Sequence, residues 1–386
     1  MKKLLALILA LAMCFALVAC GGEKKAEEKP AESKPAAEES KAPAATTVTE
    51  ETKSEADEWR AKSEGKKYNV LYIPSWAASE YFQNSYAVWS EQLAAIGWNM
   101  DMQGPEKYTA ESQLAVVESA LLSQKYDAIF LYPIDPSSVN AVLDELWDTY
   151  QVPIIQWGFP EEYGGGHYFI ATDDRYKAVG DYMVEMALEY VEENMDYFKA
   201  EYLDKGKKIP YAASGSAKNS VQNTRLLRCI ELLDADGRFE LVEHFENVGE
   251  DTALATGETL ALNHPEVEIV MGYNDAHMIN FITAFETAGV GSDYLRFFGT
   301  DGTKAAFSLM AEQGKDGKFG GTSGANHELM GEIIINMIGA AVPAAEEGQI
   351  VRAITDEAKA TFAGAIANGT AQHNITWKNV DEFYVG

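Results

Sequence analysis

Apolar residues recur with two different spacings along residues 66–345. A continuous apolar run, "YNVLYIP" (68–74), ends at a proline, and apolar residues then follow at spacings of four and three from Phe82 to Ile96. The continuous run is typical of a strand buried on both faces, whereas the second spacing is typical of one face of a helix. Because this order repeats, the pattern predicts βα units in doubly wound parallel sheets covered by helices.

The predicted strands form two sets, which indicates two Rossmann-like α/β lobes. A short strand-like segment at 168–174 and a long predicted helix at about 176–204 separate the sets. In open α/β sheets ligands bind outside the carboxyl ends of the strands, so the residues after each strand are the candidates for a site. The predicted strands lie at 68–74, 98–102, 126–133 and 152–157 in the first set, and at 208–214, 239–245, 267–273, 295–300 and 317–322 in the second.

The first 19 residues carry the pattern of an export signal. Two lysines precede an apolar run from Leu4 to Ala19, and Cys20 follows. This run is shorter than the about 20 residues that a spanning helix needs, and no basic flank follows it, so a cleaved signal peptide is favoured. "LVAC" resembles the lipobox of bacterial lipoproteins, which implies that Cys20 is lipid-modified and becomes the new N-terminus.

Residues 20–64 form a polar segment between the signal and the first predicted strand. The segment is rich in Ala, Glu, Lys and Pro and has no aromatic residue before Trp59. Such a composition cannot bury enough apolar surface to fold alone. We therefore expect a disordered tether behind a lipidated Cys20, with a partly helical stalk as the alternative.

The charge balance argues against nucleic acid as a partner. Lys and Arg total 31 against 60 for Asp and Glu, which gives a net charge of −29. A field of this sign repels phosphate backbones. Hydrophobic residues make up 47 % of the chain, which is typical of a protein that buries a core.

The sequence carries no motif for a metal, a nucleotide cofactor or a catalytic nucleophile. The six histidines are scattered, and no His-x-x-x-His group, Cys-x-x-Cys group, Gly-x-Ser-x-Gly elbow or phosphate-binding Gly-x-x-x-x-Gly-Lys loop is present. We expect no metal and no cofactor, and a core position for Cys229. An enzyme that uses a cleft carboxylate such as Asp135, Asp275 or Asp301 is the less favoured alternative, since no paired acid and base is visible.

Aromatic and polar residues gather just after the predicted strands. Flat rings with a few convergent hydrogen-bonding groups suit a small polar ligand with apolar faces, such as a sugar. Each ring has core packing as its competing role. The residues are Trp76, Tyr81, Phe82, Tyr132, Trp157, Phe159 and Tyr273, with Arg225, Asn274 and Asp301.

Several motifs follow one another in a characteristic order. A strand, a loop ending in the paired aromatics Tyr81 and Phe82, and a helix come first, and "YDAIFLYPIDPSSV" then places Pro133 and Asp135 after the third strand. "VPIIQW", "IATDDRYKAVG", "GSAKNSVQNTRLLRCIELL", "VMGYNDAHM" and "FFGTDG" follow. In this order, across about residues 66–345, they resemble the type-I periplasmic binding proteins of the ribose and galactose group.

The resemblance implies two lobes joined by three hinge crossovers, with one small ligand in the cleft between them. It assigns residues 66–173 plus about 326–350 to the N-terminal lobe. It assigns residues 174–325 plus about 351–386 to the C-terminal lobe.

The resemblance also implies roles for individual residues. Arg225, Asn274 and Asp301 match the family's hydrogen-bonding positions, and the aromatic residues would stack on the ligand or wall it in. Gly158 and Phe159 replace the Asp-Arg pair with which sugar binders of this group grip hydroxyls. The full expected ligand-binding set is Trp76, Ser79, Tyr81, Phe82, Tyr132, Trp157, Phe159, Arg225, Asn274 and Asp301.

The implied function is solute binding outside the cytoplasm. The protein would be anchored to the cell membrane by lipid on Cys20 and would deliver a small polar ligand, a sugar or sugar-like compound, to an ABC permease by cleft closure. No covalent chemistry is implied. The alternatives are a ligand sensor for a chemoreceptor or sensor kinase, and a binder of a nucleoside or another non-sugar ligand.

Overall fold

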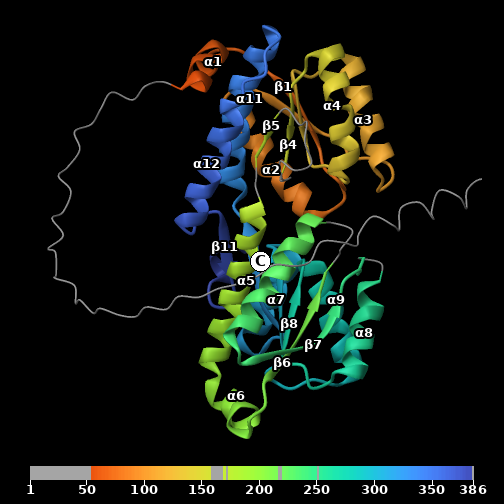
Figure 1. The fold of residues 1–386 in the computed structure, drawn as a ribbon, viewed down its shortest axis with the longest axis vertical. Helices are drawn as coiled ribbons and strands as arrows, with labels where there is room; N and C mark the ends of the chain where they lie inside the picture. Colours follow the sequence, from red (N-terminus) through yellow and green to blue (C-terminus); the bar gives the residue numbers. More distant parts are fainter. Residues whose placement is uncertain (1–53, 158–167, 171–172, 216–219, 250–251, 385–386) are drawn as a thin grey trace, which may run out of the picture. The chain divides into compact units, whose positions relative to one another are not determined.

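The computed structural model describes residues 54–157, 168–170, 173–215, 220–249 and 252–384, all within one compact unit, Thr52–Gly386. The expected signal peptide, Cys20 and most of the expected tether lie outside the described residues, as does Phe159. The described chain forms two α/β lobes, each built on one sheet (Figure 1). The predicted fold class is confirmed.

The first lobe is built on a five-stranded parallel sheet with the strand order β2-β1-β3-β4-β5. All four residues of β3 and the last four of β1 are buried, as expected for strands covered on both faces. The strands are β1 (Asn69–Ile73), β2 (Asn99–Met102), β3 (Ala128–Leu131), β4 (Ile154–Gln156) and β5 (Tyr168–Phe169).

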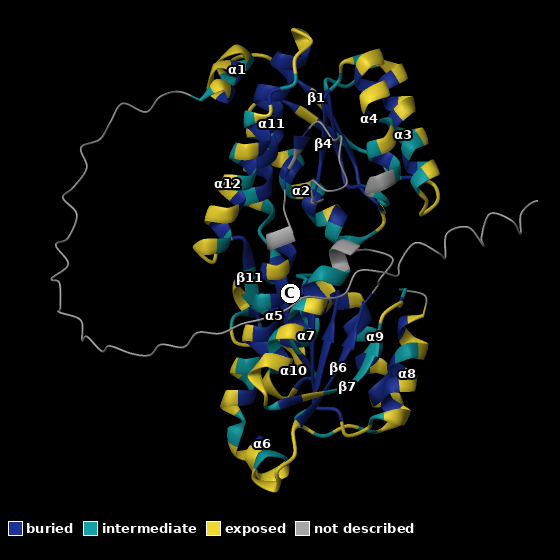
Figure 2. Ribbon diagram, viewed as in Figure 1, coloured by how far each residue is buried: buried dark blue, intermediate teal, exposed yellow. Residues whose placement is uncertain are grey.

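Alternate residues of β1 face two separate cores, because successive side chains of a strand point to opposite faces. Val70 and Tyr72 pack in a core with α2, α11 and α12, whereas Leu71 and Ile73 pack in a core with α3 and α4. Figure 2 shows these helices with buried residues toward the sheet and exposed residues away from it. The helices are α2 (Glu80–Ala95), α3 (Ala110–Ser123), α4 (Pro136–Tyr150), α11 (His327–Glu346) and α12 (Ala353–Ala367).

The second lobe is built on a six-stranded sheet with the order β11-β10-β9-β8-β6-β7, in which only β11 runs antiparallel to its neighbour. One core packs with α5, α6 and α7, and the other with α8, α9 and α10. The strands are β6 (Ile209–Ser214), β7 (Phe239–Phe245), β8 (Ile269–Gly272), β9 (Arg296–Asp301), β10 (Phe319–Ala325) and β11 (Gln372–Ile375). The helices are α5 (Asp173–Glu193), α6 (Met195–Glu201), α7 (Ser220–Asp236), α8 (Ala253–Asn263), α9 (Asp275–Ala288) and α10 (Lys304–Gln313), with short 3-10 turns η2 (Leu203–Lys205), η3 (Gly314–Asp316) and η4 (Val380–Glu382).

Helix α5 takes part in both lobes. Tyr176 in its first turn packs in the core of the first lobe, whereas Val179 and Met183 pack in the core of the second. The chain passes between the lobes twice more, between β10 and α11 and between α12 and β11. The structure therefore contains the three crossovers that the family resemblance implies.

The structure differs from the expected tether at its C-terminal end. Residues Glu55–Ser63 form helix α1, which begins with a capping box between Ser54 and Asp57. Trp59 is 7 % exposed and packs in the core of the first lobe. The polar segment is thus folded from residue 54 onward. The polar composition of this segment does not indicate a packed helix, because only Ala56 and Trp59 of α1 are buried.

The structure also differs from the expected boundary near residue 351. The resemblance assigns the segment from about residue 351 to the second lobe, but Ile354, Ala358 and Phe362 of α12 pack in the core of the first. Their spacing of four forms one apolar stripe, and α12 contacts β5 and α5. Only the segment from β11 onward returns to the second sheet.

Within the described ranges, α11 alone is long and apolar enough to cross a membrane by length and composition. Most of its residues are buried inside the molecule, where Ile334 and Ile338 pack in the core of the first lobe. Its apolar character is therefore that of a core helix.

Candidate ligand-binding site

A cavity of about 730 Å³ lies at the carboxyl ends of strands from both sheets. Its volume falls within the about 300–1,000 Å³ typical of small-molecule sites. Nine of the ten expected ligand-binding residues line it, and the tenth, Phe159, lies outside the described residues. The nine are Trp76, Ser79, Tyr81, Phe82, Tyr132, Trp157, Arg225, Asn274 and Asp301.

Packed aromatic rings form the first-lobe wall of the cavity. The ring centroids of Phe82 and Tyr132 are 5.0 Å apart in an edge-to-face arrangement, and those of Tyr132 and Trp157 are 6.0 Å apart. Trp157 is 1 % exposed, whereas Trp76 is 37 % exposed and meets Tyr108 edge-on. Trp157 therefore supports the wall, and Trp76 offers the accessible ring face.

The start of helix α2 adds hydroxyl groups to this wall. Ser79 is the N-cap residue of α2, but its side chain makes no capping hydrogen bond. Burial raises the pKa of Tyr81 to about 12, so its phenol stays neutral at ordinary pH. Both hydroxyls can thus donate a hydrogen bond to a ligand or accept one from it.

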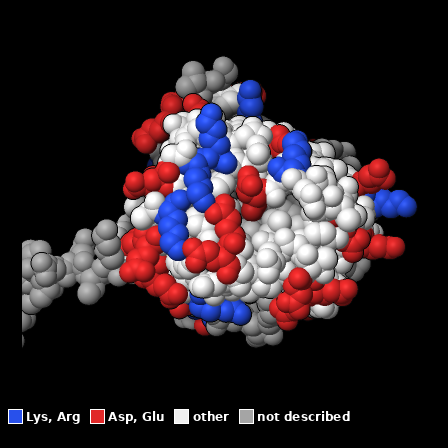
Figure 3. All heavy atoms as spheres, turned by 90° about the horizontal axis from the view of Figure 1, so that it is seen from above, with Lys and Arg blue, Asp and Glu red and all other residues white. Residues whose placement is uncertain are grey.

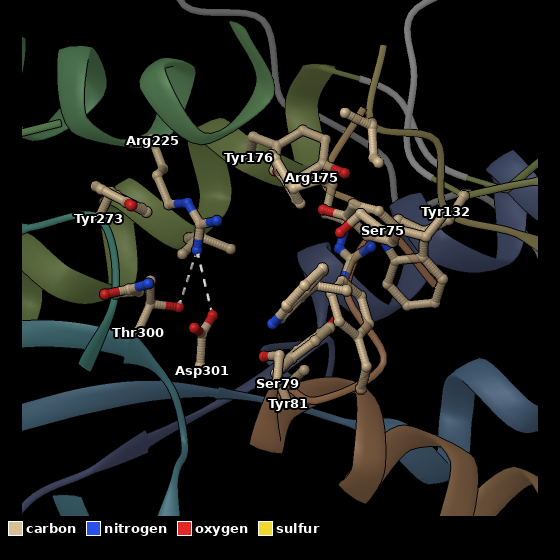
Figure 4. Close-up of a pocket in the computed structure, with 18 of the residues that line it drawn as sticks. Ser75, Ser79, Tyr81, Tyr132, Arg175, Tyr176, Arg225, Tyr273, Thr300 and Asp301 are labelled. Atoms are coloured by element: carbon tan, nitrogen blue, oxygen red, sulfur yellow. Dashed lines mark hydrogen bonds and ion pairs between the residues drawn. The ribbon is translucent and has the colours of Figure 1, made fainter. Parts of the chain in front are cut away.

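Arg225 on α7 supplies a buried positive charge from the second lobe, being 7 % exposed. Its Nη1 donates to Oγ1 of Thr300 at 3.4 Å and lies 3.7 Å from Oδ1 of Asp301 (Figure 4). Its Nε has no hydrogen-bond partner. Figure 4 shows Arg225, Thr300 and Asp301 together on one side of the cavity.

Asp301 stands at a strained backbone position. Its φ of 122° lies in a region that favours glycine, and Gly302 follows with a φ of 68°. A non-glycine residue held in such a region costs on the order of 1–3 kcal/mol, and such residues cluster at functional sites. The cavity wall thus keeps a carboxylate where the backbone alone would prefer glycine.

Asn274 presents only part of its amide to the cavity. It is the N-cap residue of α9, and its Oδ1 accepts from the backbone N–H of His277 at 2.9 Å. Its NH₂ group is therefore the part that can donate to a ligand.

Tyr273 lies beside Asn274, with Oη 2.9 Å from Nε2 of His277. Burial lowers the pKa of His277 to about 4, so this imidazole is neutral at ordinary pH.

The three carboxylates of the enzyme alternative have structural partners. Asp275 is fully buried and does not line the cavity, and its Oδ2 accepts from N and Oγ1 of Thr303 at 2.9 and 3.1 Å. Burial, and after it the charge of Asp301, raises the pKa of Asp275 to about 8. Asp135 lines the cavity and accepts from Oγ of Ser138 at 2.5 Å. Thr303 therefore holds Asp275 outside the cavity, and Ser138 hydrogen-bonds Asp135 at its wall.

Sequence reasoning missed Arg175 and Tyr176, which line the cavity from the first turn of α5. Both are buried, and the Arg175 guanidinium lies 4.1 Å from the ring centroid of Trp157. The expectation that ligands bind at the carboxyl ends of strands does not identify these two residues, because they belong to a helix at a crossover between the lobes. The feature of the sequence that could have pointed to them is an arginine beside a tyrosine within the "IATDDRYKAVG" motif.

The structure brings to the cavity further residues that are not in the expected ligand-binding set. Ser75 and Thr300 stand at the ends of β1 and β9, next to predicted residues. Gln372 begins β11, a strand that the apolar pattern did not predict. In the part of the chain that the structure describes, no group of three or more His, Cys, Asp or Glu residues could hold a metal ion.

Comparison with known proteins agrees with this geometry. A family model described as a periplasmic binding protein domain matches residues 70–347. A search of curated proteins finds no match. Among solved structures, AraP, an arabinose-binding protein from Geobacillus stearothermophilus, has a TM-score of 0.61 at 13 % identity, over 83 % of this chain and 99 % of that one.

Two further solved structures show the same fold. A periplasmic solute-binding protein of an ABC transporter from Actinobacillus succinogenes 130z, with bound D-allose, has a TM-score of 0.59 at 18 % identity, over 74 % of this chain and 93 % of that one. A solute-binding protein of an ABC transporter from Bacillus halodurans C-125, with bound myo-inositol, has a TM-score of 0.56 at 17 % identity, over 83 % and 97 %. The family match spans most of the sequence and the two-lobed fold agrees with it, so the chain belongs to the periplasmic binding protein domain family, with the type-I fold.

Proposed function

We propose that this protein binds a sugar or sugar-like compound outside the cytoplasm and delivers it to an ABC importer in the cell membrane. The observation that carries the proposal is the cavity of about 730 Å³ that both lobes line. Its first-lobe wall is aromatic and its second-lobe wall carries Arg225, Asn274 and Asp301. Rings that cover the apolar faces of a pyranose, combined with charged groups that bind its hydroxyls, suit such a ligand.

The similar structures support the choice of ligand class. Two of the similar structures contain a bound ligand, D-allose in one and myo-inositol in the other, and both ligands are small polyhydroxylated rings. Those proteins share 17 to 18 % identity with this chain, so they support a class of ligand rather than one compound.

Delivery to a permease is the role that fits two lobes joined at three crossovers. A ligand that contacts both walls of the cavity stabilises the closed arrangement of the lobes, because it binds that arrangement more tightly than the open one. The importer then distinguishes the loaded protein by its closed form. The protein carries out no covalent chemistry in this role.

The N-terminal sequence supports attachment to the membrane. Cys20 follows the signal-like apolar run in the "LVAC" motif. Two or more acyl chains on one cysteine give the stable anchoring that a single chain does not. We propose that lipid on Cys20 holds the protein beside its importer.

A ligand screen tests the proposal. Purified protein is heated with neutral hexoses, pentoses, cyclitols, nucleosides or amino acids, and compounds that raise the unfolding temperature are titrated by calorimetry. A ligand at 100 times its Kd stabilises the fold by about 2.7 kcal/mol, which is readily measured. Stabilisation by sugars or cyclitols supports the proposal. Stabilisation by nucleosides or amino acids alone overturns the ligand class, and no stabilisation by any class overturns the binding role.

A further inference from the structure

Arg175 places a buried positive charge in the first-lobe wall of the cavity. Its side chain comes from the first turn of α5, lines the cavity and is 4 % exposed. Figure 4 shows it with Tyr132 and Tyr176, on the side of the cavity opposite Arg225 and Asp301.

Aromatic rings fix the plane of this guanidinium. Its central carbon lies 4.1 Å from the ring centroid of Trp157 and 5.0 Å from that of Phe362. Arginine stacks on ring faces in this way and keeps its N–H groups in the plane of the fork. A ligand must therefore meet Arg175 at the edge of its guanidinium.

The charge of Arg175 is not balanced by the protein groups that the structure describes. Its Nε and Nη1 have no hydrogen-bond partner and are closed to solvent. No carboxylate among the described side chains lies within the 4.0 Å of an ion pair. A buried charge without a counter-ion is strongly unfavourable, more so than an unpaired neutral group.

The groups around Arg175 cannot take the place of a counter-ion. Burial raises the pKa values of Tyr132 and Tyr176, and that of Tyr81 to about 12, so these phenols are neutral. The other positive charge of the cavity differs in this respect, because Arg225 has Asp301 at 3.7 Å. The first-lobe wall therefore has a positive charge for which a ligand can supply the partner.

We propose that the ligand is a sugar acid and that Arg175 binds its carboxylate. This inference rests on the proposed function and narrows its ligand class. A carboxylate accepts hydrogen bonds only, is planar and carries one charge, so it matches the edge of one stacked guanidinium. A neutral hydroxyl would accept a hydrogen bond but would leave the charge of Arg175 uncompensated.

Matched sugars test the inference on the unmodified protein. Calorimetry compares glucose with glucuronate and glucose 6-phosphate, and galactose with galacturonate and galactose 6-phosphate. We expect at least one uronate to bind about tenfold or more tightly than its parent hexose, with a preference that weakens as salt is added. Equal or tighter binding of the hexoses, or tighter binding of the phosphates, overturns the carboxylate assignment.

Variants assign the effect to Arg175. Arg175→Gln should lower uronate affinity by about tenfold or more while changing hexose affinity far less, and Arg175→Lys should keep part of the preference. Lys177→Gln removes the same charge from an exposed position on the same helix and should change neither affinity. Equal losses for hexose and uronate in Arg175→Gln contradict the inference.

The outcome separates the inference from the proposed function. Neutral sugars that bind without any gain from a carboxylate overturn the inference and leave the proposed function standing. Failure of both hexoses and uronates to bind, in a protein whose unfolding transition is intact, counts against both.

Discussion

The Nη1 atom of Arg225 lies 3.7 Å from Oδ1 of Asp301, across the gap between helix α7 and the end of strand β9. This distance exceeds the about 2.7–2.9 Å of a charge-assisted hydrogen bond. The pair is therefore loose enough for a ligand to bind both groups at once. Because both side chains line the cavity, ligand binding would depend on this pair more than folding does.

Removing the guanidinium tests this dependence. Arg225→Ala should weaken binding of the ligand found in the screen by a factor of about 30 or more, because loss of one buried charged partner costs about 2 kcal/mol or more. Calorimetric titration gives the affinity. The matched control is Arg228→Ala on the same helix, whose Nε pairs with Asp181 at 2.7 Å outside the cavity. Equal affinity losses in the two variants would contradict the site assignment.

The backbone at Asp301 gives a second prediction. Asp301→Gly should be more stable than Asp301→Ala by about 1 kcal/mol or more, because only glycine adopts a φ of 122° without strain. Both variants lose the carboxylate, so their difference isolates the backbone. Urea unfolding measures it. At ordinary positions an alanine variant is more stable than a glycine variant. If Asp301→Ala were the more stable of the two here, the strain would be absent.

The buried carboxyl of Asp275 predicts a pH dependence of stability. Burial raises its pKa from the ordinary value of 3.8 to about 8 in the folded protein, so folding takes up a proton between these pH values. The free energy of unfolding should then fall as pH rises from about 4 to about 8, by up to about 1.4 kcal/mol per pH unit. Urea midpoints across this range measure the slope.

An amide at the same position supplies the control for this slope. Asp275→Asn cannot ionise and keeps an oxygen for the N–H and hydroxyl of Thr303. The difference in stability between the variant and the wild type should therefore grow in the variant's favour with rising pH. A constant difference across the range would rule out the raised pKa.

Helix α1 predicts that the folded unit begins before the first strand. Trp59→Ala should destabilise the protein by about 3 kcal/mol, as expected for a large buried side chain. Glu58→Ala changes an exposed residue on the same helix and should cost less than about 0.5 kcal/mol. Similar small losses in both variants would mean that α1 does not contribute to the core in solution.

The anchor proposal predicts the behaviour of one thiol. Cys20→Ser should abolish lipid labelling, because serine lacks the thiol to which lipid is attached, and should shift the protein from the membrane fraction to the soluble fraction or leave it unprocessed. Metabolic labelling with a fatty acid, followed by fractionation, measures both effects. Cys229→Ser is the matched control, since this thiol is buried in the second lobe. Lipid labelling that survives Cys20→Ser would refute the anchor.

Most strands of the two sheets were predictable because a strand buried on both faces is a continuous apolar run in the sequence. The runs that became β1 and β3 are apolar at nearly every position. Strand β11 is not a continuous apolar run, since it lies at the sheet edge and two of its four residues are only partly buried. For α12, an apolar stripe shows that a helix packs on something, but it does not show which lobe receives it.

The residues that line the cavity were predictable where their positions follow from strand order. Trp76, Tyr132 and Asn274 come directly after strands or within a few residues of them, and the carboxyl ends of parallel strands meet at one edge. Arg175 stands instead at the start of a helix, where sequence alone does not tell an exposed arginine from a buried one. Its stacking on Trp157 depends on a contact between residues 18 positions apart that only the fold establishes.

The position of α11 and α12 in the chain sets the order in which the protein can fold. The sheet of the first lobe is complete at Phe169, yet α11 and α12, two of the three helices that cover one of its faces, span residues 327 to 367. During synthesis, α2 can cover Tyr72 and Phe130 on that face early, because its Trp89 packs against both rings. Strand β5, which α12 contacts, is covered only when almost the whole chain has been made. A chain that stops before α11 would expose the part of this face that α11 and α12 cover and be prone to aggregate. The first lobe, although it begins the sequence, can finish folding only when the second lobe has been made.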